Sequence, residues 1–343
     1  MSSVLNRIWI TAFLLLFYVC QNSCYAEQTD DSTRILRCRN FFNLTSSFTR
    51  TIFSTSILNA DDNAKLKYRT SNPFRFGIAF DYRWFGIELG LNVPVLPSQK
   101  TRKGETKTSS FRFSVNGRRI TFMAQYTNFH GFYLNNDQFI YNFLSKLNPL
   151  PKRPDMLSSI FQTNILYYFN HNQFSNPAAV GQYERQIKSG GSPLAGLGVQ
   201  FYELTADSSF IPKNFKEKFP NLSQIKSITG IQSYFTIGYI YSFILKKKWF
   251  LTLAASPSFT RFQSKETLFD ASERLHWDLG FRFESRLVFG HNGERLYYGA
   301  WHTGFWTNER LLSGNYLDQT MQTFRFFCGL RFKTRRSLGF LGL

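Results

Sequence analysis

The feature that most constrains this chain is an alternation of apolar and polar residues, which is clearest between Leu275 and Phe289. Leu, Trp and Phe, with one Ser, occupy every second position of this segment. The positions between them, up to residue 286, hold His276, Asp278, Gly280, Arg282, Glu284 and Arg286. Successive side chains of a strand point to opposite faces. The segment is therefore expected to be a strand with one apolar face and one charged face.

The same alternation recurs along most of the chain. It is strong in Phe74–Arg83, Phe85–Val93 and Thr323–Phe332. Weaker versions run over Thr49–Leu58, Thr108–Val115, Arg119–Tyr126, Ser158–Phe169, Ala178–Gln186, Leu194–Leu204, Gly230–Phe243, Trp249–Phe262 and Arg295–Phe305. The segments are about 9–15 residues long, whereas a tilted membrane-spanning strand needs about 9–11 residues and strands of soluble proteins peak near about five or six. Their length favours a membrane barrel over a soluble sandwich.

These segments predict an all-β protein, a transmembrane antiparallel up-and-down β-barrel of about twelve strands, with ten or fourteen as alternatives. Thirteen segments are present, and a closed antiparallel barrel of the bacterial type has an even number of strands. One segment is therefore expected not to be a wall strand. The doubtful segment is Thr49–Leu58, because it is rich in Ser and Thr.

The N-terminus has the three parts of a secretory signal peptide. Arg7 precedes an apolar stretch, Ile8–Val19, that is too short to span a bilayer, and Cys24-Tyr25-Ala26 places small residues before a cleavage site. We expect a signal peptide over residues 1–26, a lead-in over 27–48, a barrel over 49–333 and a tail over 334–343. An uncleaved anchor and a lipoprotein cysteine at Cys20 or Cys24 are the alternatives.

The composition and the charge fit a surface that alternates residue by residue. Aromatic residues make up 18% of the chain, yet its mean hydropathy is −0.26. The formal net charge is +19, and loss of Arg7 with a signal peptide leaves 40 basic and 22 acidic residues, or +18. A soluble protein this basic would suggest nucleic acid as a partner, but export argues against that. Outer-membrane lipid headgroups, or a small anionic solute in the lumen, complement the charge better.

The connections between segments alternate in length over the first half of the chain. The tight turns are expected at Tyr82–Phe85, Val115–Arg119 and Asn170–Phe174. Pro94–Lys107 and Asn128–Leu157 are expected to be long, with a short helix in Asp137–Leu147. In bacterial barrels short turns face the periplasm and long loops face the exterior. The Asn128–Leu157 loop could lie outside the barrel or fold inward as a plug.

Charged residues on the polar strand faces are the best-defined candidate site. The residues expected to line the lumen are Arg75, Asp81, Glu88, His276, Asp278, Arg282, Glu284, Arg286, Arg325 and Arg331. Such a lining could select a small anionic solute, or it could be a salt-bridge network that fills and stiffens the interior. Both alternatives stay open, since twelve strands fall between small filled barrels and wide porins.

Tryptophans are expected at the two membrane interfaces, because outer-membrane barrels carry aromatic girdles there. The candidates are Trp84, Trp249, Trp277, Trp301 and Trp306. Packing inside a core is the alternative for each of them.

Catalytic residues, metal sites and cofactors are not predicted. His276 and Asp278 share a strand face and His302 lies on the next strand, but no nucleophile can be matched to them. The spacing of histidines and cysteines does not suggest zinc. Cys38 and Cys328 lie near the two ends of the mature chain, where barrel closure could bring them together, although two unpaired thiols are the expectation.

Several stretches resemble a family of outer-membrane β-barrel proteins from Bacteroidota-type bacteria that is known only as a domain of unknown function. The matching text is Ser71–Pro94 (SNPFRFGIAFDYRWFGIELGLNVP), Gly131–Asn135 (GFYLN), Arg153–Asp155 (RPD), Tyr168–Ser175 (YFNHNQFS), Gln182–Ser192 (QYERQIKSGGS) and Ala206–Pro212 (ADSSFIP). These stretches cover most of the mature chain in one order. The resemblance implies a barrel fold and an outer-membrane location, and it implies no activity.

The sequence thus predicts a non-enzymatic outer-membrane barrel that acts as a small pore, a solute conduit or a surface binding or structural protein. Its expected partners are outer-membrane lipid, the barrel-assembly machinery and a small anionic solute. An outer-membrane enzyme acting on lipid or peptide is one alternative. A secreted soluble β-barrel that binds a hydrophobic ligand is the other.

Overall fold

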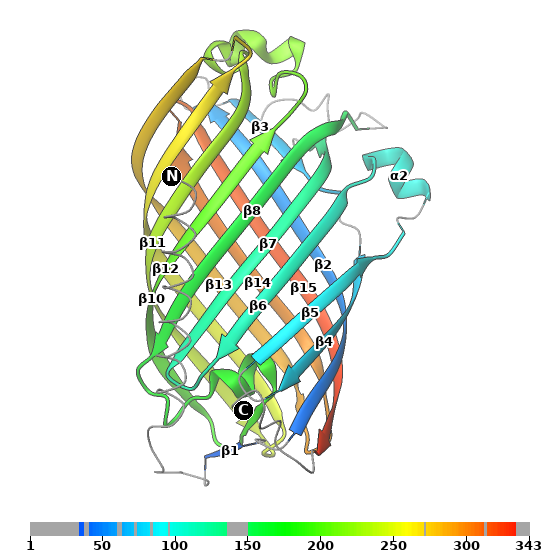
Figure 1. The fold of residues 1–343 in the computed structure, drawn as a ribbon, viewed down its shortest axis with the longest axis vertical. Coiled ribbons are helices and arrows are strands. Elements are labelled where there is room, and N and C mark those ends of the chain that lie inside the picture. Colours follow the sequence, from blue (N-terminus) through cyan, green and yellow to red (C-terminus); the bar gives the residue numbers. More distant parts are fainter. Residues whose placement is uncertain are drawn as a thin grey trace, which may run out of the picture.

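The computed structural model describes residues 34–37, 41–59, 64–71, 74–82, 85–94, 97–135, 150–270, 272–311 and 314–333. The described chain is a tall, tilted barrel of antiparallel strands (Figure 1). Five features predicted from the sequence lie outside the described residues. They are the signal peptide (1–26), Cys38, Trp84, the helix in Asp137–Leu147 and the tail (334–343).

Within the described chain, thirteen strands form one sheet. They are β2 (Phe41–Asn59), β3 (Ala64–Arg69), β4 (Phe74–Tyr82), β5 (Phe85–Asn92), β6 (Lys107–Asn116), β7 (Ile120–Leu134), β8 (Lys152–Tyr168), β10 (Gly190–Thr205), β11 (Ile225–Leu245), β12 (Trp249–Leu268), β13 (Glu273–Asn292), β14 (Leu296–Arg310) and β15 (Tyr316–Lys333). The smaller elements are β1 (Ile35–Arg37), α2 (Pro97–Lys103), the π-helical turn η1 (Pro177–Gly181), β9 (Glu184–Gln186) and the 3₁₀ helices η2 (Lys213–Lys218) and η3 (Pro220–Leu222). Among the described residues, no helix is long and apolar enough to span a lipid bilayer.

The sheet closes into a ring of twelve strand positions. β15 pairs with β2 along nearly its whole length, from Lys333 opposite Phe41 to Tyr316 opposite Leu58. The other edge of β2 pairs with β4 in its first half and with β3 in its second half. β3 and β4 therefore share one position in the ring, which confirms the predicted count of twelve.

The sequence prediction doubted the wrong segment as a wall strand. Thr49–Leu58 is part of the wall strand β2, and its Ser and Thr residues fit there because several of them face the polar lumen, as buried Thr49 and Thr51 do. Ala178–Gln186 is not a wall strand. It forms η1 and the short strand β9, because Pro177 and Gly181 interrupt the strand pattern.

The two ends of the barrel differ. One end of the barrel carries the short turns after β6, β11 and β13, the start of β2 and the end of β15. We call it the turn end. The other, here the loop end, carries α2, η2 and η3. In Figure 1 the turn end is at the bottom.

Three predicted boundaries need correction. β2 begins at Phe41, so the barrel starts before residue 49, in the segment expected as a lead-in. Asn170–Phe174 is not a tight turn between wall strands, because β8 connects to β10 through η1 and β9. The Asn128–Leu157 loop is shorter than expected, since β7 runs to Leu134 and β8 starts at Lys152.

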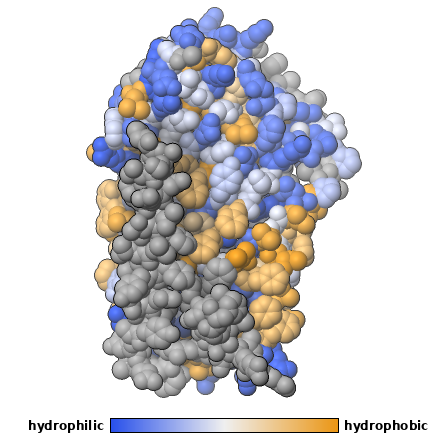
Figure 2. Space-filling model, viewed as in Figure 1, coloured by the Kyte–Doolittle hydropathy of each residue, from blue (hydrophilic) through white to orange (hydrophobic). Residues whose placement is uncertain are grey.

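The outer face carries the apolar side chains of the alternating pattern. Leu91 and Leu279 are 78% and 77% exposed, and many Phe residues of the wall are about half exposed. Figure 2 shows hydrophobic residues along the middle and lower part of the visible wall and hydrophilic residues gathered at the loop end. We call this exposed apolar zone the belt. Its extent is far beyond the scattered apolar residues that soluble proteins expose.

Candidate functional site

The loop end of the lumen is closed by the connection between β10 and β11. Phe210, Phe219 and Leu222 of this connection are buried against lumen-facing residues of the wall, such as Phe53 and Phe129. The apolar cluster that they form fills the upper lumen. A continuous apolar core excludes water and ions, so this end is not an open mouth in the structure.

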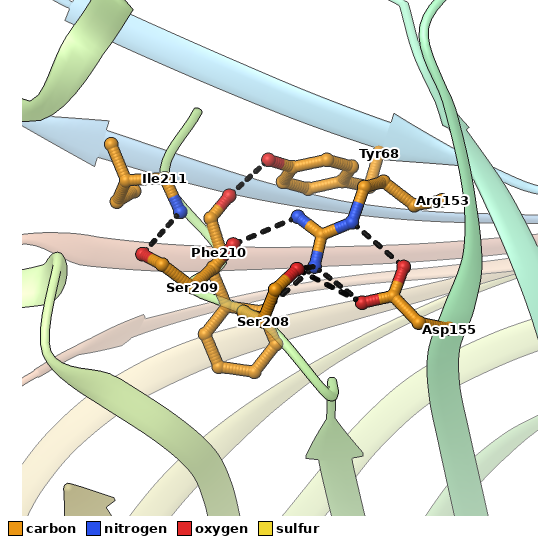
Figure 3. Close-up of polar contacts among 7 residues, drawn as sticks. All are labelled: Tyr68, Arg153, Asp155, Ser208, Ser209, Phe210 and Ile211. Carbon is orange, nitrogen blue, oxygen red and sulfur yellow. Dashed lines mark hydrogen bonds and ion pairs between the residues drawn. The ribbon is translucent and has the colours of Figure 1, made fainter. Parts of the chain in front are cut away.

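A polar clamp holds the connection in place (Figure 3). Arg153 of β8 donates two hydrogen bonds to the carboxylate of Asp155, at 2.9 and 2.8 Å. The same guanidinium donates to the backbone carbonyls of Ser209 and Ser208, at 2.9 and 3.1 Å. The Tyr68 hydroxyl donates to the carbonyl of Phe210. The clamp thus satisfies backbone groups that closure would otherwise leave unpaired.

Arg282 forms the floor of the apolar cluster. Its side chain is 1% exposed, and its guanidinium nitrogens donate to the carboxylate of Glu284 at 2.7 and 2.8 Å. The remaining hydrogen bonds from its guanidinium go to the side-chain oxygens of Gln200 (2.8 Å), Gln232 (3.3 Å) and Gln162 (3.4 Å). Four strands therefore converge on one cation.

Two aromatic rings lie against the same guanidinium. The Arg282 Cζ atom is 4.0 Å from the ring centroid of Phe305 and 4.7 Å from that of Tyr234. Cation–π contacts of a desolvated arginine are stabilising. Arg282 and Glu284, here the Arg282 layer, therefore separate the apolar cluster on the loop-end side from the rest of the lumen on the turn-end side.

The turn end is closed by the connection between β8 and β10, residues 169–189, which we call the plug. It contains η1 and β9, and β9 pairs with β1 in a small antiparallel sheet. Asn176 donates to Thr121 at 2.9 Å, and Arg118 of the wall donates to Glu184 at 3.1 Å. The plug is therefore fixed to the wall by side chains.

Arg331 of β15 is the main wall contact of the plug. Its side chain donates to the Gln182 carbonyl at 3.1 and 2.6 Å and to the Asn292 side chain at 2.5 Å. Gln182 has a φ of 58°, in the left-handed region that a non-glycine residue adopts at a cost. Asn43 also donates to the Gln182 carbonyl, at 3.3 Å. These contacts hold the strained residue in position.

Tyr183 ties the plug to β4, which is separated from β15 by β2 alone. Its hydroxyl donates to the Asp81 carboxylate at 2.9 Å. Burial raises the pKa of the Tyr183 hydroxyl well above its usual value, and the negative charge of Asp81 raises it further. Tyr183 is therefore a neutral donor at physiological pH.

A chamber of about 180 Å³ lies between the Arg282 layer and the plug. Six of the sequence-predicted residues line it, namely Asp81, Glu88, Arg282, Glu284, Arg286 and Arg325. Arg112, which the sequence reasoning did not select, lines it too. Arg325 donates to Glu88 at 2.9 Å. The predicted lumen charges are thus largely gathered in one space.

A narrow space in the lumen, here the recess, adjoins the chamber and is lined by residues of β2, β4, β5, β6, β7, β14 and β15. Its lining includes Arg75, Glu88, Arg112, Trp301 and Arg325. The guanidinium carbons of Arg112 and Arg325 lie 5.6 and 5.7 Å from the Trp301 ring centroid. Among the described residues, Nε of Arg75, Nε of Arg325 and the indole Nε1 of Trp301 have no hydrogen-bond partner.

The charge of this space is unbalanced. The charged residues that line the chamber and the recess are Arg75, Arg112, Arg282, Arg286, Arg325, Asp81, Glu88 and Glu284. Within the described lining, five arginines against three carboxylates leave a formal charge of +2. Arginine is the side chain best suited to bind oxyanions by paired hydrogen bonds. The space is chemically suited to a small anion.

Three predicted lining residues lie elsewhere. Arg331 faces inward but binds the plug, as described above. His276 and Asp278 are half-buried near the loop end, beyond the Arg282 layer. Asp278 accepts a hydrogen bond from the backbone of Arg310 at 3.2 Å.

The tryptophans divide between the two faces. Trp277 and Trp306 are exposed on the outer face, and Trp249 stacks with Phe289 near the turn end. Trp301 was expected at a membrane interface, but it lines the chamber. The reason is the two-residue period of β14, which puts Trp301 on the same face as buried Tyr297 and Phe305 and opposite to Trp306.

The histidines do not assemble into a catalytic group. His302 contacts the ring of Phe324, which is an outward residue of β15, at a centroid distance of 4.5 Å. It pairs with Leu287 in the β13 register, many residues away from His276 and Asp278. Within the described residues there is no group of three or more His, Cys, Asp or Glu side chains that could hold a metal. Cys328 is a free thiol on the outer face.

The sequence reasoning missed the residues that complete the site. Arg112 occupies a polar position in the alternating pattern of β6, between Phe111 and Phe113. The alternation could therefore have predicted that its side chain faces the lumen. The glutamines around Arg282 come from β8, β10 and β11. The sequence does not show that these glutamines lie at the same level along the barrel axis, because that level depends on the register of three hairpins.

The family comparison matches residues 31–332 to the family described as a domain of unknown function, DUF4421. This match covers most of the chain. The chain belongs to the DUF4421 family. No curated protein matches this DUF4421 chain.

Several solved structures are similar to the DUF4421 chain at low identity. The outer membrane protease OmpT from Escherichia coli is 9% identical, covers 86% of this chain and 97% of its own, and has a TM-score of 0.39. The translocator domain of the autotransporter NalP from Neisseria meningitidis is 7% identical, covers 96% and 98%, and has a TM-score of 0.34. The toluene transporter TodX from P. putida is 7% identical, covers 87% and 91%, and has a TM-score of 0.28.

Proposed function

We propose that this chain is exported by its N-terminal signal peptide and spans a bacterial outer membrane, with the belt in contact with lipid. The exposed apolar belt around a closed ring of long strands supports this location. The turn end then faces the periplasm and the loop end the exterior. The Bacteroidota-type origin belongs to the same proposal. It follows from the sequence resemblance alone.

The membrane location is tested by extraction and gel mobility. We expect the folded protein to stay in the outer-membrane fraction, to need detergent for solubility and to migrate differently before and after heating. A folded protein that stays soluble without detergent would contradict the location and favour a secreted barrel.

Within this location, the protein acts as a solute-binding barrel that holds a small oxyanion in the chamber. The observation that carries this function is the chamber itself, with a charge of +2 between two closures. An open pore fits less well, since the apolar cluster and the plug fill the two ends of the lumen. A non-enzymatic role is part of the proposal, because His302 and the pair of His276 and Asp278 are separated by the wall.

Calorimetric titration of the purified barrel with inorganic phosphate tests the binding function. We expect saturable binding, and we expect R112Q/R286Q to weaken it at least tenfold, because both arginines line the chamber. R261Q is the matched control, since Arg261 is exposed on the outer face over Trp277. Absence of binding to the wild type, or equal binding by all variants, would contradict the function.

A further inference from the structure

The wall of the barrel has a weak seam between β5 and β6. Their backbone pairing runs from Phe85 opposite Val115 to Glu88 opposite Arg112. Both strands continue toward the loop end, β5 to Asn92 and β6 back to Lys107. In this described stretch the two strands have no further backbone pairing. Every other neighbouring pair of full-length wall strands is paired over a longer stretch.

Side chains bridge the seam instead of a backbone ladder. The Asn92 amide donates to the carbonyl of Thr108 at 2.7 Å, and Arg75 donates to the Ser110 hydroxyl. At the loop-end limit, the backbone amides of Ser71 and Thr106 each donate to the hydroxyl of the other residue at 2.8 Å. Side-chain bridges can be exchanged for other partners at lower cost than a continuous ladder of backbone hydrogen bonds.

The two sides of the seam differ in chemistry. On the outside, Leu89, Leu91 and Phe111 are exposed in the belt, at 62%, 78% and 49%. On the inside lies the recess with Arg75 and its neighbouring arginines. The seam is thus a short path between the apolar outer surface and the basic chamber.

The path is narrow, and where it meets the unpaired stretch of β5 the inward residue is a glycine. Gly90 lines the recess, and a Cβ atom placed on it would meet one neighbour, the Phe76 carbonyl, at an ordinary contact distance of 3.7 Å. Ser110, which also lines the recess, has a small side chain. Continuing the register from Glu88 and Arg112 puts these two residues opposite each other. Both sides of the seam are therefore small at the point where the recess reaches it.

The volume of the chamber limits what it can hold. A dry cavity of about 150 Å³ accommodates one benzene molecule, so the chamber of about 180 Å³ matches a charged headgroup. A long hydrocarbon chain would have to leave it. The recess and the seam lead such a chain to the belt, where apolar surface is already exposed to lipid.

We propose that the seam is a lateral portal for a single-chain anionic amphiphile, whose carboxylate or phosphate headgroup sits among the chamber arginines while its chain passes between β5 and β6 into the bilayer. This proposal rests on the anion site proposed above and specifies its ligand. The three buried donors of Arg75, Arg325 and Trp301 that have no partner among the described residues support an incoming acceptor. The outer side of the portal lies among the belt residues Leu89, Leu91 and Phe111, so with the belt in lipid, water cannot satisfy the unpaired backbone groups of the seam.

A disulfide across the seam tests the portal. The variant is G90C/S110C in a C38S/C328S background, reconstituted in phosphatidylcholine vesicles. The matched control is A255C/S285C in the same background, because Ala255 and Ser285 are partners in the continuous ladder between β12 and β13. The probes are 11-(dansylamino)undecanoic acid, followed by its emission against protein-free vesicles, and inorganic phosphate.

We expect the oxidised G90C/S110C barrel to bind the dansyl fatty acid at least tenfold more weakly than its reduced form, with phosphate affinity changed less than twofold. Oxidation of the control should change neither affinity. Unchanged binding of the fatty acid to the oxidised variant would overturn the portal. Phosphate binding without fatty-acid binding in the reduced form would also overturn the portal but leave the anion site standing. Binding of neither probe would overturn both.

A second variant keeps the test valid where the disulfide fails to form. G90F fills the recess without oxidation. It should weaken fatty-acid binding at least tenfold and leave phosphate affinity within twofold. Wild-type affinity of G90F for the fatty acid would contradict the portal.

Discussion

Replacing Arg282, the buried arginine between the apolar cluster and the chamber, tests the described interior most sharply. Arg282 is 1% exposed and is bonded to Glu284 and to three glutamines. In R282M the hydrocarbon volume is largely kept, but four acceptors lose their donor and two aromatic rings lose a cation.

The expected loss of stability follows from these contacts. Removing one partner of a buried ion pair costs about 3–5 kcal/mol. Glu284 is 28% exposed on its side chain, so water compensates part of the loss, and we expect R282M to lower the free energy of unfolding by about 3 kcal/mol. R282K keeps the charge but loses the planar fork, and about 2 kcal/mol should be lost. R282M/E284Q should regain at least about 1 kcal/mol, because it removes the stranded carboxylate.

Guanidinium unfolding of the barrel in zwitterionic detergent, followed by far-ultraviolet circular dichroism, measures these differences. R274M is the matched control, since Arg274 is exposed, and its stability should stay within about 0.5 kcal/mol of the wild type. An R282M barrel as stable as the control would refute the reasoning that this arginine holds the layer together.

The other predictions concern the plug and the two faces of the wall. R331M should lower the free energy of unfolding by about 3 kcal/mol and speed amide hydrogen exchange within the plug, since Arg331 holds the plug; wild-type exchange rates in the plug would contradict this. In vesicles of brominated lipid, loss of fluorescence should be strong for Trp306 and weak for Trp301, measured in two variants in which each is the single remaining tryptophan; equal quenching would contradict the inward position of Trp301. The raised pKa of Tyr183 means that the folded state keeps the proton longer than the unfolded state. The stability from this group is therefore complete below the usual tyrosine pKa near about 10 and is lost as the pH rises above it. The alkaline loss of stability should be smaller in Y183F, and an unchanged pH profile would exclude this group as its cause.

The alternation in the sequence was enough to predict the fold. It placed Arg282, Glu284 and Arg286 on one face of β13 and Phe281 and Phe283 on the other, as the structure has them. It works because the two faces of a barrel wall meet lipid and lumen, so each residue carries the polarity of its side. The same rule could have placed Trp301 and Arg112 in the lumen had it been applied to their neighbours.

The plug and the closed loop end could not be predicted this way. Ala178–Gln186 mimics a strand over a few residues, and its inward position depends on distant partners such as Arg331 and Asp81. The cluster around Phe210 and Phe219 depends on a loop folding back, which leaves no periodic signal. Register between hairpins decides which side chains share a height, and the alternation contains no information on it.

The most direct test of the central claim is anomalous diffraction from crystals of the barrel soaked in selenate. A chamber with a formal charge of +2 predicts a selenium peak inside the lumen within hydrogen-bond distance of Arg112 or Arg286. Selenium peaks at exposed arginines such as Arg261, with none in the chamber, would contradict the claim that this barrel holds an anion in its interior.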